Sequence, residues 1–209
     1  DLVIPDVTYL RENRDRVRAI LLTHGHEDHT GGLPYVLPQI PGTPIYTSRL
    51  TAGLVTGKLK EHKLLGQTRL EVVEPAVEFR VGAFAITPFR VNHSIPDGMG
   101  FAIRTPLGTV VHTGDFKFDH TPPDGRRADL GLIAEIGNHG VEFLLSDSTR
   151  AEREGYTLSE MTVGESLKQL VSEATGRVIV ATFASNIGRV QQVLDAAWAS
   201  GRKMVALGR

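Results

Sequence analysis

The most informative stretch of this sequence is Thr23-His24-Gly25-His26-Glu27-Asp28-His29-Thr30-Gly31-Gly32, where three histidines and two carboxylates fall within six positions. It directly follows Val17–Leu22, a near-continuous apolar run that is typical of a strand buried on both faces. A loop that curls over the end of a sheet can bring its side chains to one point. Gly25 lets the backbone turn tightly between His24 and His26, so both imidazoles can reach one cation.

The second half of this stretch can serve a second cation, because Asp28 and His29 lie near a predicted helix start. The alternative is a surface loop that is merely rich in histidine, which is the usual explanation for a single histidine. The pattern His-x-His-x-Asp-His, between an apolar strand and Gly31-Gly32, argues strongly against that alternative. The sequence has no cysteine, so any metal must be held by His, Asp or Glu.

The composition is that of an ordinary soluble globular protein, with 41% hydrophobic and 22% charged residues among 209. The net charge of -1 excludes a polyelectrolyte that binds nucleic acid through overall charge alone. No apolar run approaches the roughly 18 residues of a membrane span, and no secretory leader is visible, so we expect no membrane and a cytoplasmic location. The chain begins at Asp1 without a methionine and ends at Arg209 after an apolar run, which suggests a piece of a larger fold.

Outside the histidine-rich stretch, strands and helices are predicted to alternate. A short strand, Ile45–Thr47, precedes a helix that Ser48 can cap and that extends to about Leu65. Apolar residues flank the turns Gly82-Ala83 and Pro106-Leu107-Gly108, so both turns are expected to close hairpins. This order of elements indicates an α/β fold.

The last third of the chain reads as strand–helix units. A helix is expected over residues 129–138 and a buried strand over residues 141–145. Thr157 and Glu160 have the spacing of a capping box, which predicts a helix from there to about Ala174. The elements expected next are a strand at 177–183, a helix at 186–199 and a strand at 203–207. The change of composition near residues 150–156 is the best candidate for a domain boundary.

Two other strand ends carry residues that can bind metal. His93 follows an apolar strand that ends at Val91, and Asp115 follows another that ends near His112. Taken alone, a strand-end histidine more often makes a hydrogen bond, and a Gly-Asp turn is usually only a turn. Their order after the first motif favours ligands in both cases. His112 lies three residues before Asp115 and is the alternative ligand there, although we interpret it as packed or as a supporting residue.

The segment His24–His29 resembles the metal-binding signature of the metallo-β-lactamase superfamily. That resemblance implies an αββα sandwich and two divalent metal ions, for which zinc is favoured and manganese is compatible. It also implies catalytic roles for Asp28 and Asp115. The general acid is left open: Glu27 is a candidate, but a residue between ligands more often supports the loop than transfers protons. The implied metal ligands are His24, His26 and His93 for one ion, Asp28 and His29 for the other, and Asp115 as the bridge. The superfamily pattern expects one more histidine far downstream, which His62, His120 and His139 do not match.

The later sequence resembles a narrower group. Leu144–Thr149 resembles the segment that bears the acidic motif A residue of the β-CASP branch, which would make Asp147 catalytic. The plain alternative for Asp147 is a carboxylate that caps a turn. Thr113–Asp119 and Ala181–Arg189 resemble the ribonuclease J family. This resemblance implies a metallo-β-lactamase catalytic domain at 1–152, incomplete at its N-terminus, and the start of an α/β β-CASP domain at 153–209.

The family resemblance also implies an activity. It implies a metal-dependent ribonuclease that cleaves single-stranded RNA to leave 5′-phosphates, as a 5′-to-3′ exonuclease with endonuclease activity in RNA maturation and decay. It implies a dimer or tetramer for the complete protein. The alternatives are a thioester or lactone hydrolase of the same superfamily, a DNA-processing β-CASP protein, and a non-catalytic RNA-binding scaffold.

Overall fold

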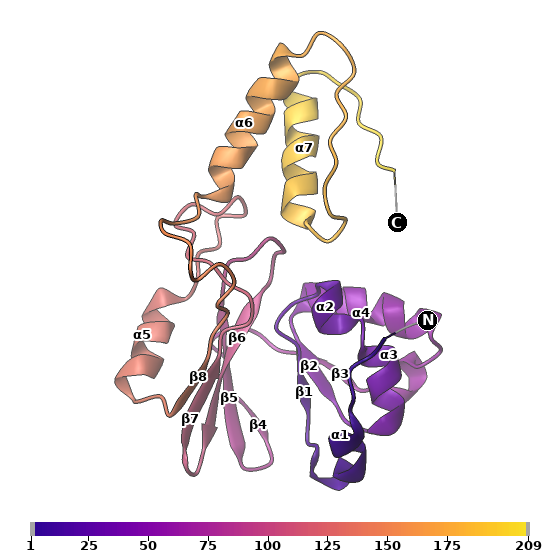
Figure 1. The fold of residues 1–209 in the computed structure, drawn as a ribbon, viewed down its shortest axis with the longest axis vertical. Helices are drawn as coiled ribbons and strands as arrows, with labels where there is room; N and C mark the ends of the chain where they lie inside the picture. Colours follow the sequence, from indigo (N-terminus) through magenta and orange to yellow (C-terminus); the bar gives the residue numbers. More distant parts are fainter. Residues whose placement is uncertain (1–2, 208–209) are drawn as a thin grey trace.

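The computed structural model describes residues 3–207, so the two chain ends, Asp1 and Arg209, lie outside the described residues. Two β-sheets lie face to face with helices on their outer sides, and a pair of helices stands beyond one end of the sheets (Figure 1). This arrangement is the predicted α/β sandwich of four layers, followed by a smaller helical unit.

The first sheet consists of three parallel strands in the order β1-β2-β3. Its strands are β1 (Ile20–Leu21), β2 (Ile45–Thr47) and β3 (Leu70–Val72). The helices of this half of the molecule are α1 (Thr8–Glu12), α2 (Glu27–Thr30), α3 (Leu33–Val36) and α4 (Arg49–Glu61). Because parallel strands need a crossover between them, α2 to α4 cover the outer face of this sheet.

The second sheet has five strands in the order β4-β5-β6-β7-β8. They are β4 (Phe79–Val81), β5 (Phe84–Arg90), β6 (Met99–Thr105), β7 (Gly108–His112) and β8 (Phe143–Leu145). Both predicted hairpins are present, and β8 pairs parallel to β7 after the crossover helix α5 (Leu130–Asn138). The left-handed backbone of Gly82, with φ of 59°, closes the first hairpin.

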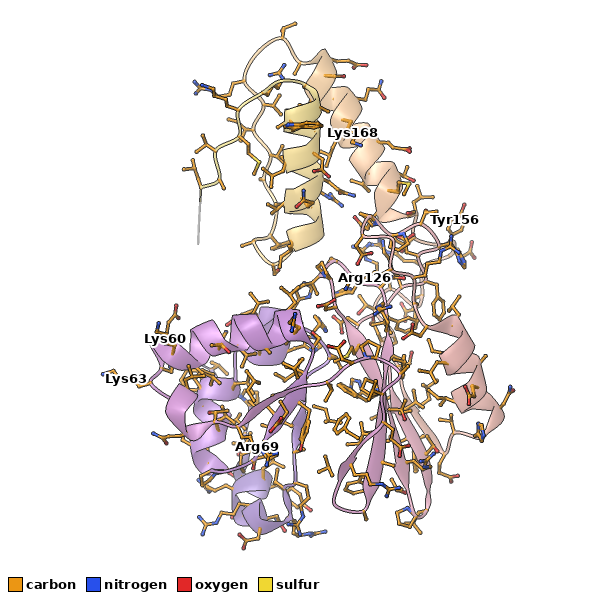
Figure 2. All side chains as sticks on the ribbon, turned by 180° about the vertical axis from the view of Figure 1, so that it is seen from behind. Lys60, Lys63, Arg69, Arg126, Tyr156 and Lys168 are labelled. Atoms are coloured by element: carbon orange, nitrogen blue, oxygen red, sulfur yellow. The ribbon has the colours of Figure 1, made fainter. Side chains whose placement is uncertain are left out.

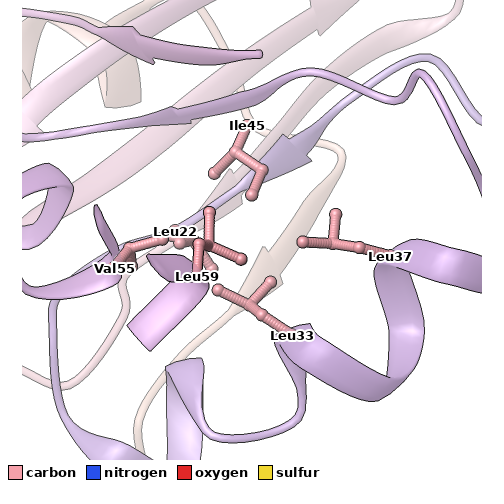
Figure 3. Packing of buried hydrophobic residues seen from close by; sticks show 6 residues of the cluster. All are labelled: Leu22, Leu33, Leu37, Ile45, Val55 and Leu59. Atoms are coloured by element: carbon pink, nitrogen blue, oxygen red, sulfur yellow. The ribbon is translucent and has the colours of Figure 1, made fainter. Parts of the chain in front are cut away.

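The alternation of side chains along the strands separates the hydrophobic core into three clusters, one between each pair of layers. In β1 and its flanks, Ile20 and Leu22 pack toward the helices, whereas Ala19 and Leu21 pack toward the second sheet. The helix-side cluster contains Leu22, Leu33, Leu37, Ile45, Val55 and Leu59 (Figure 3). The cluster between the sheets contains Val81, Ile86, Met99 and Phe101, and the cluster under α5 contains Phe89, Val91, Ala102 and Val111.

Two strand predictions within the two sheets need correction. Of the predicted strand Val17–Leu22, Ile20 and Leu21 form β1 and the N–H of Leu22 donates to the carbonyl oxygen of Tyr46, whereas residues 17–19 have no strand partner among residues 3–207. The strand predicted over 141–145 forms as β8, but it is not buried. Phe143 and Leu144 are 64% and 62% exposed, and among residues 3–207 β8 is the last strand of the second sheet, with β7 as its neighbour.

The C-terminal unit contains α6 (Glu160–Glu173) and α7 (Ile187–Ala199), which pack against each other (Figure 1). The predicted capping box is wrong, because Ser159 caps α6 through its hydroxyl and Thr157 lies outside the helix. The strands predicted at 177–183 and 203–207 are extended segments without a strand partner among residues 3–207. An extended segment becomes a strand only when another backbone pairs with it.

No helix within residues 3–207 combines the length and the apolar character needed to cross a bilayer.

Gly57 in α4 offers a simple test of the helix assignment. It is exposed, and a Cβ added there would meet no atom within 4 Å. We expect Gly57→Ala to stabilise the folded chain by about 0.5–1 kcal/mol, because alanine loses less backbone entropy in a helix. Urea unfolding would measure this change. The control is Gly42→Ala, in equally open space but at φ of 78°, which should destabilise instead.

Candidate metal centre

All six predicted metal ligands lie at one rim of the sandwich, where strands end. His24 and His26 follow β1, and Asp28 and His29 lie in α2. His93 follows β5, and Asp115 follows β7. Residues separated by more than ninety positions in the sequence therefore meet at one place, as the strand-end argument predicts.

The first group of donors consists of His24, His26, His93 and Asp115, whose donor atoms all lie within 4.8 Å of one another. The Nδ1 atom of His26 is 3.1 Å from Nε2 of His24 and 3.1 Å from Nε2 of His93. Three imidazole nitrogens thus converge on one point with a carboxylate beside them. Three nitrogens and one oxygen are a common donor set for zinc.

The second group consists of Asp28, His29 and Asp115. The Nε2 atom of His29 is 3.6 Å from Oδ2 of Asp28 and 3.4 Å from Oδ1 of Asp115. The other oxygen of Asp115, Oδ2, faces the first group, at 3.8 Å from His24 Nε2 and 3.6 Å from His93 Nε2. The two oxygens of one carboxylate therefore face two different groups of donors.

The histidines of the first group are held in the neutral form that a metal ligand requires. Burial, reinforced by the neighbouring His29, His93 and His26, lowers the pKa of His24 to about 3. Burial is also the main cause that lowers the pKa of His26 and of His93. Neutral imidazoles with converging nitrogens and a shared carboxylate fit a divalent cation well.

Hydroxyl groups next to the ligands help to orient the imidazole rings. The Oγ1 atom of Thr23 is 3.0 Å from Nδ1 of His24, and Oγ of Ser94 is 3.4 Å from Nε2 of His26. Such outer contacts fix which nitrogen of a histidine faces a metal. Thr23 and Ser94 are adjacent in the sequence to the ligands His24 and His93. This adjacency could have suggested a supporting role, but it does not show which histidine each hydroxyl contacts.

His112 does not belong to either donor group among the described residues. The ring is exposed rather than packed, and its Nδ1 accepts a hydrogen bond of 3.0 Å from the backbone N–H of Gly114. His112 therefore supports the turn that leads into Asp115, which is the supporting role considered for it.

Glu27 lies among the ligands in sequence but faces away from them. Both of its carboxylate oxygens lie 2.5 Å from Nζ of Lys58 on α4. This ion pair ties the start of α2 to α4 and favours a supporting role for Glu27 over proton transfer. Sequence reasoning missed Lys58, because its partner lies 31 positions away and no local pattern joins them.

Asp147 lies at the end of β8, outside both donor groups but close to them. Its Oδ2 accepts a hydrogen bond of 3.4 Å from the N–H of Phe116, the residue after Asp115. Its backbone N–H donates to Oγ1 of Thr113 at 3.0 Å. Burial alone would raise the pKa of Asp147, but hydrogen bonds from Thr149 and Phe116 outweigh it, so the pKa is lowered. Asp147 is thus an ionised carboxylate that contacts the loop carrying Asp115.

The other histidines considered from the sequence are His62, His120 and His139, and they make other contacts or face solvent. The ring of His62 meets the edge of Tyr35, and Nδ1 of His139 lies 2.8 Å from the carbonyl oxygen of Glu135. His120 is exposed. None of the three joins a donor group among the residues that the structure describes.

Comparison with known proteins agrees with the fold and the motif. The sequence model of the β-lactamase superfamily domain matches residues 3–181. A crystal structure of a protein of unknown function from Enterococcus faecalis has the same fold, with a TM-score of 0.62 and 20% identity over 85% of this chain and 44% of that one. The chain belongs to the β-lactamase superfamily, in agreement with the four-layer fold.

Within that superfamily, the predicted resemblance to ribonuclease J is confirmed. The model of the ribonuclease J β-CASP domain matches residues 175–209. Ribonuclease J of Thermus thermophilus is 51% identical over the whole chain, and ribonuclease J2 of Bacillus subtilis is 46% identical. The chain spans only 38% of the length of each of these two relatives. The predicted fold class, a metallo-β-lactamase domain followed by the start of a β-CASP domain, is therefore correct.

Proposed function

We propose that this chain carries the catalytic centre of a metal-dependent ribonuclease that hydrolyses RNA phosphodiesters. The observation that carries this proposal is the placement of Asp115, whose two oxygens face two separate groups of donors. Relatives that match the whole chain are named ribonuclease J, which supports RNA as the substrate.

Two divalent cations fit the two donor groups. His24, His26 and His93 would hold one cation, Asp28 and His29 the other, and Asp115 both. Nitrogen and oxygen donors favour zinc and are compatible with manganese. When bound, two such ions would lower the pKa of a water molecule and offset negative charge on a phosphoryl oxygen.

The carboxylates of the chain have distinct tasks in this proposal. Asp115 holds the two donor groups together, and Asp28 keeps its exposed carboxylate available at the open side of the centre. Asp147 positions the Asp115 loop through the N–H of Phe116. Asp28 and Asp115 are the proposed catalytic carboxylates, and Asp147, which was predicted as catalytic, is proposed as a positioning residue. Water, not the RNA 2′-hydroxyl, would be the nucleophile.

An open cleft beside the first donor group suits a chain-like substrate. The lining of this cleft includes His93, Lys117 and Arg126. Figure 2 shows Arg126 near the opening between the helical unit and the sheets. Of the other labelled basic residues, Lys60, Lys63 and Arg69 lie in the half of the molecule that contains the first sheet, away from this opening, and Lys168 lies on α6.

Basic groups at the cleft can contact phosphates. The lining also includes the acidic residues Asp97, Asp119, Asp124 and Glu160. Arg126 pairs with Asp97 and Lys117 with Glu160, so a phosphate would compete with these carboxylates.

The finer details follow from the ribonuclease J relatives and remain predictions. We expect 5′-to-3′ exonuclease and endonuclease activity that leaves 5′-phosphates on single-stranded RNA, in RNA maturation and decay. We also expect a cytoplasmic protein that forms a dimer or tetramer, with a domain boundary between residues 152 and 153.

The decisive experiment is incubation of the complete protein with internally labelled, 5′-monophosphorylated single-stranded RNA, with manganese or zinc, and with EDTA as the control. Metal-dependent release of 5′-mononucleotides supports the proposal and gives the polarity. Cleavage of an all-deoxynucleotide strand would instead identify a DNA-processing enzyme. If no metal supports RNA cleavage while a thioester or lactone is hydrolysed, the ribonuclease proposal is refuted and only the superfamily assignment is retained.

Metal binding can also be tested without any substrate. We expect a chelator to lower the unfolding temperature of the complete protein and added zinc to restore it. A ligand that binds only the folded state stabilises by about 2.7 kcal/mol at a hundredfold excess over its Kd. In a thermal melt, His93→Gln should weaken the response to zinc. His139→Gln, at an exposed histidine outside both donor groups, should leave the response unchanged. Equal responses of the two variants would argue against a metal at the first group.

A further inference from the structure

Four charged side chains outside the metal centre meet where α6 and α7 begin. They are Lys117, Asp119, Glu160 and Arg189, and we refer to them as the junction. One oxygen of Glu160 accepts a hydrogen bond of 2.9 Å from Nζ of Lys117, and the other accepts one of 2.8 Å from the guanidinium of Arg189. Lys117 also lies 3.6 Å from Oδ2 of Asp119. Glu160 thus joins two cations that come from different segments.

The junction is shielded from water more than an ordinary surface ion pair. The side chain of Asp119 is 1% exposed, and those of Glu160 and Arg189 are 24% and 25% exposed. Burial alone would raise the pKa of Glu160, but hydrogen bonds from Arg189 and Lys117 outweigh it and lower the pKa. Two positive and two negative charges balance, so removal of one leaves a partly buried charge without a partner.

The junction fixes the start of both helices. Oδ2 of Asp119 accepts a hydrogen bond of 3.0 Å from the N–H of Glu160, so a carboxylate from a distant segment satisfies the first turn of α6. Gln192 of α7 donates to the carbonyl oxygen of Glu160 at 2.7 Å. Nε of Arg189 donates to Oε1 of Gln192 at 3.1 Å. Glu160 is therefore bonded through its N–H, its carbonyl oxygen and its side chain.

The same junction is continuous with the metal centre. The N–H of Lys117 donates to the carbonyl oxygen of Asn92 at 2.8 Å, which places Lys117 beside the residue that precedes His93. Lys117 also lies two positions after Asp115. Lys117 and Glu160 line the cleft that His93 also lines, so the junction forms one wall of this cleft.

We propose that the junction is a positioning device that holds the start of the β-CASP domain in a fixed orientation over the cleft. Glu160 is its central positioning residue. The part of a substrate that extends beyond the metal centre would then contact the starts of α6 and α7, which the junction holds at a fixed position relative to Asp115 and His93. This inference rests on the proposed function for its substrate, but its structural part can be tested separately.

The test compares Glu160→Gln with Glu165→Gln in the complete protein. Glu165 is an exposed residue of the same helix, outside the junction. We expect Glu160→Gln to raise KM for an RNA oligonucleotide about tenfold, with kcat within about twofold of wild type, because binding contacts remote from the reaction are lost. Hydrolysis of bis(p-nitrophenyl) phosphate, a diester too small to reach the helices, and metal content should not change. Glu165→Gln should match wild type throughout.

Hydrogen exchange gives a readout that needs no substrate. Amides in the first turns of α6 and α7 should exchange about tenfold faster in Glu160→Gln, since local opening costs less free energy there. Exchange in β5 and β6 should stay the same. Glu160→Asp, which keeps the charge, should raise KM and the exchange rates less than Glu160→Gln does.

A mutant cycle checks that Glu160 and Arg189, two of the four residues, act as one unit. If they do, Glu160→Gln combined with Arg189→Gln should raise KM little more than either change alone, because residues in one network are not additive. Additive losses, or a Glu160→Gln protein that behaves as Glu165→Gln does in exchange, overturn the inference. A wild-type protein that cleaves no RNA would instead refute the proposed function, and the exchange comparison would still decide the role of the junction.

Discussion

Replacement of Asp115 with alanine is expected to abolish RNA cleavage by the complete protein, with a fall in kcat on the order of 10³-fold or more. The physical reason is that Oδ1 of Asp115 faces His29 while Oδ2 faces His24 and His93. A single truncation therefore removes a donor from both groups. Initial rates on labelled RNA, metal content and RNA affinity should be measured together. The affinity should change little, because Asp115 is an anion and does not attract phosphate.

Two further variants make this prediction sharper. Asp28→Ala removes a donor from the second group only, so it should also abolish cleavage while leaving RNA binding largely intact. Asp195→Ala is the matched control, because Asp195 is exposed on α7 and its carboxylate accepts a hydrogen bond from Gln191, its one side-chain partner within residues 3–207. Residual cleavage near the wild-type rate in Asp115→Ala or Asp28→Ala would refute the two-cation proposal.

The second large effect is expected at Gly114, the residue before Asp115. Gly114 has φ of 62°, and an added Cβ would lie 2.8 Å from Cβ of Thr23 and 3.1 Å from the carbonyl oxygen of Met99. We expect Gly114→Ala to destabilise the fold by about 2–5 kcal/mol, from left-handed strain together with overpacking. Zinc affinity should fall as well, because relief of the clash displaces Thr23, which contacts His24.

The control for Gly114 is Gly125. It has φ of 70°, but a Cβ added there would meet nothing within 4 Å. Gly125→Ala should therefore show only the backbone strain, about 1–2 kcal/mol, and unchanged zinc affinity. Urea unfolding and competition with a chromogenic chelator would measure both quantities. If the two variants lose equal stability and equal zinc affinity, the close approach at Gly114 has no part in forming the centre.

The donor groups could be predicted from the sequence because their information is local. Each of His24, His93 and Asp115 follows an apolar strand, and strand ends of a sandwich meet at one rim. The hairpins were equally accessible, since Gly82 lies between two alternating apolar runs. Short-range pattern and the rules of sheet assembly predicted the first motif and the hairpins, whereas the division of the six ligands between two ions came from the resemblance to the metallo-β-lactamase superfamily.

Contacts between side chains far apart in the sequence could not be predicted in the same way. The contact of Lys58 with Glu27 and the contact of Lys117 with Glu160 join positions that share no local pattern. The apolar composition of β8 suggested burial, but its place at a sheet edge leaves Phe143 exposed, and composition does not reveal strand order. Residues 177–183 have the composition of a strand, yet they pair with no other strand among residues 3–207.

The two hairpin turns have a practical consequence for biophysical work. The turns at Gly82-Ala83 and at Leu107 lie at the end of the sheets opposite to the helical unit (Figure 1), and Leu107 is 92% exposed. A fluorophore or an immobilisation tether attached there would leave the metal rim and the cleft facing solution. Because the sequence contains no cysteine, one cysteine introduced at position 107 would give a single labelling site on this chain.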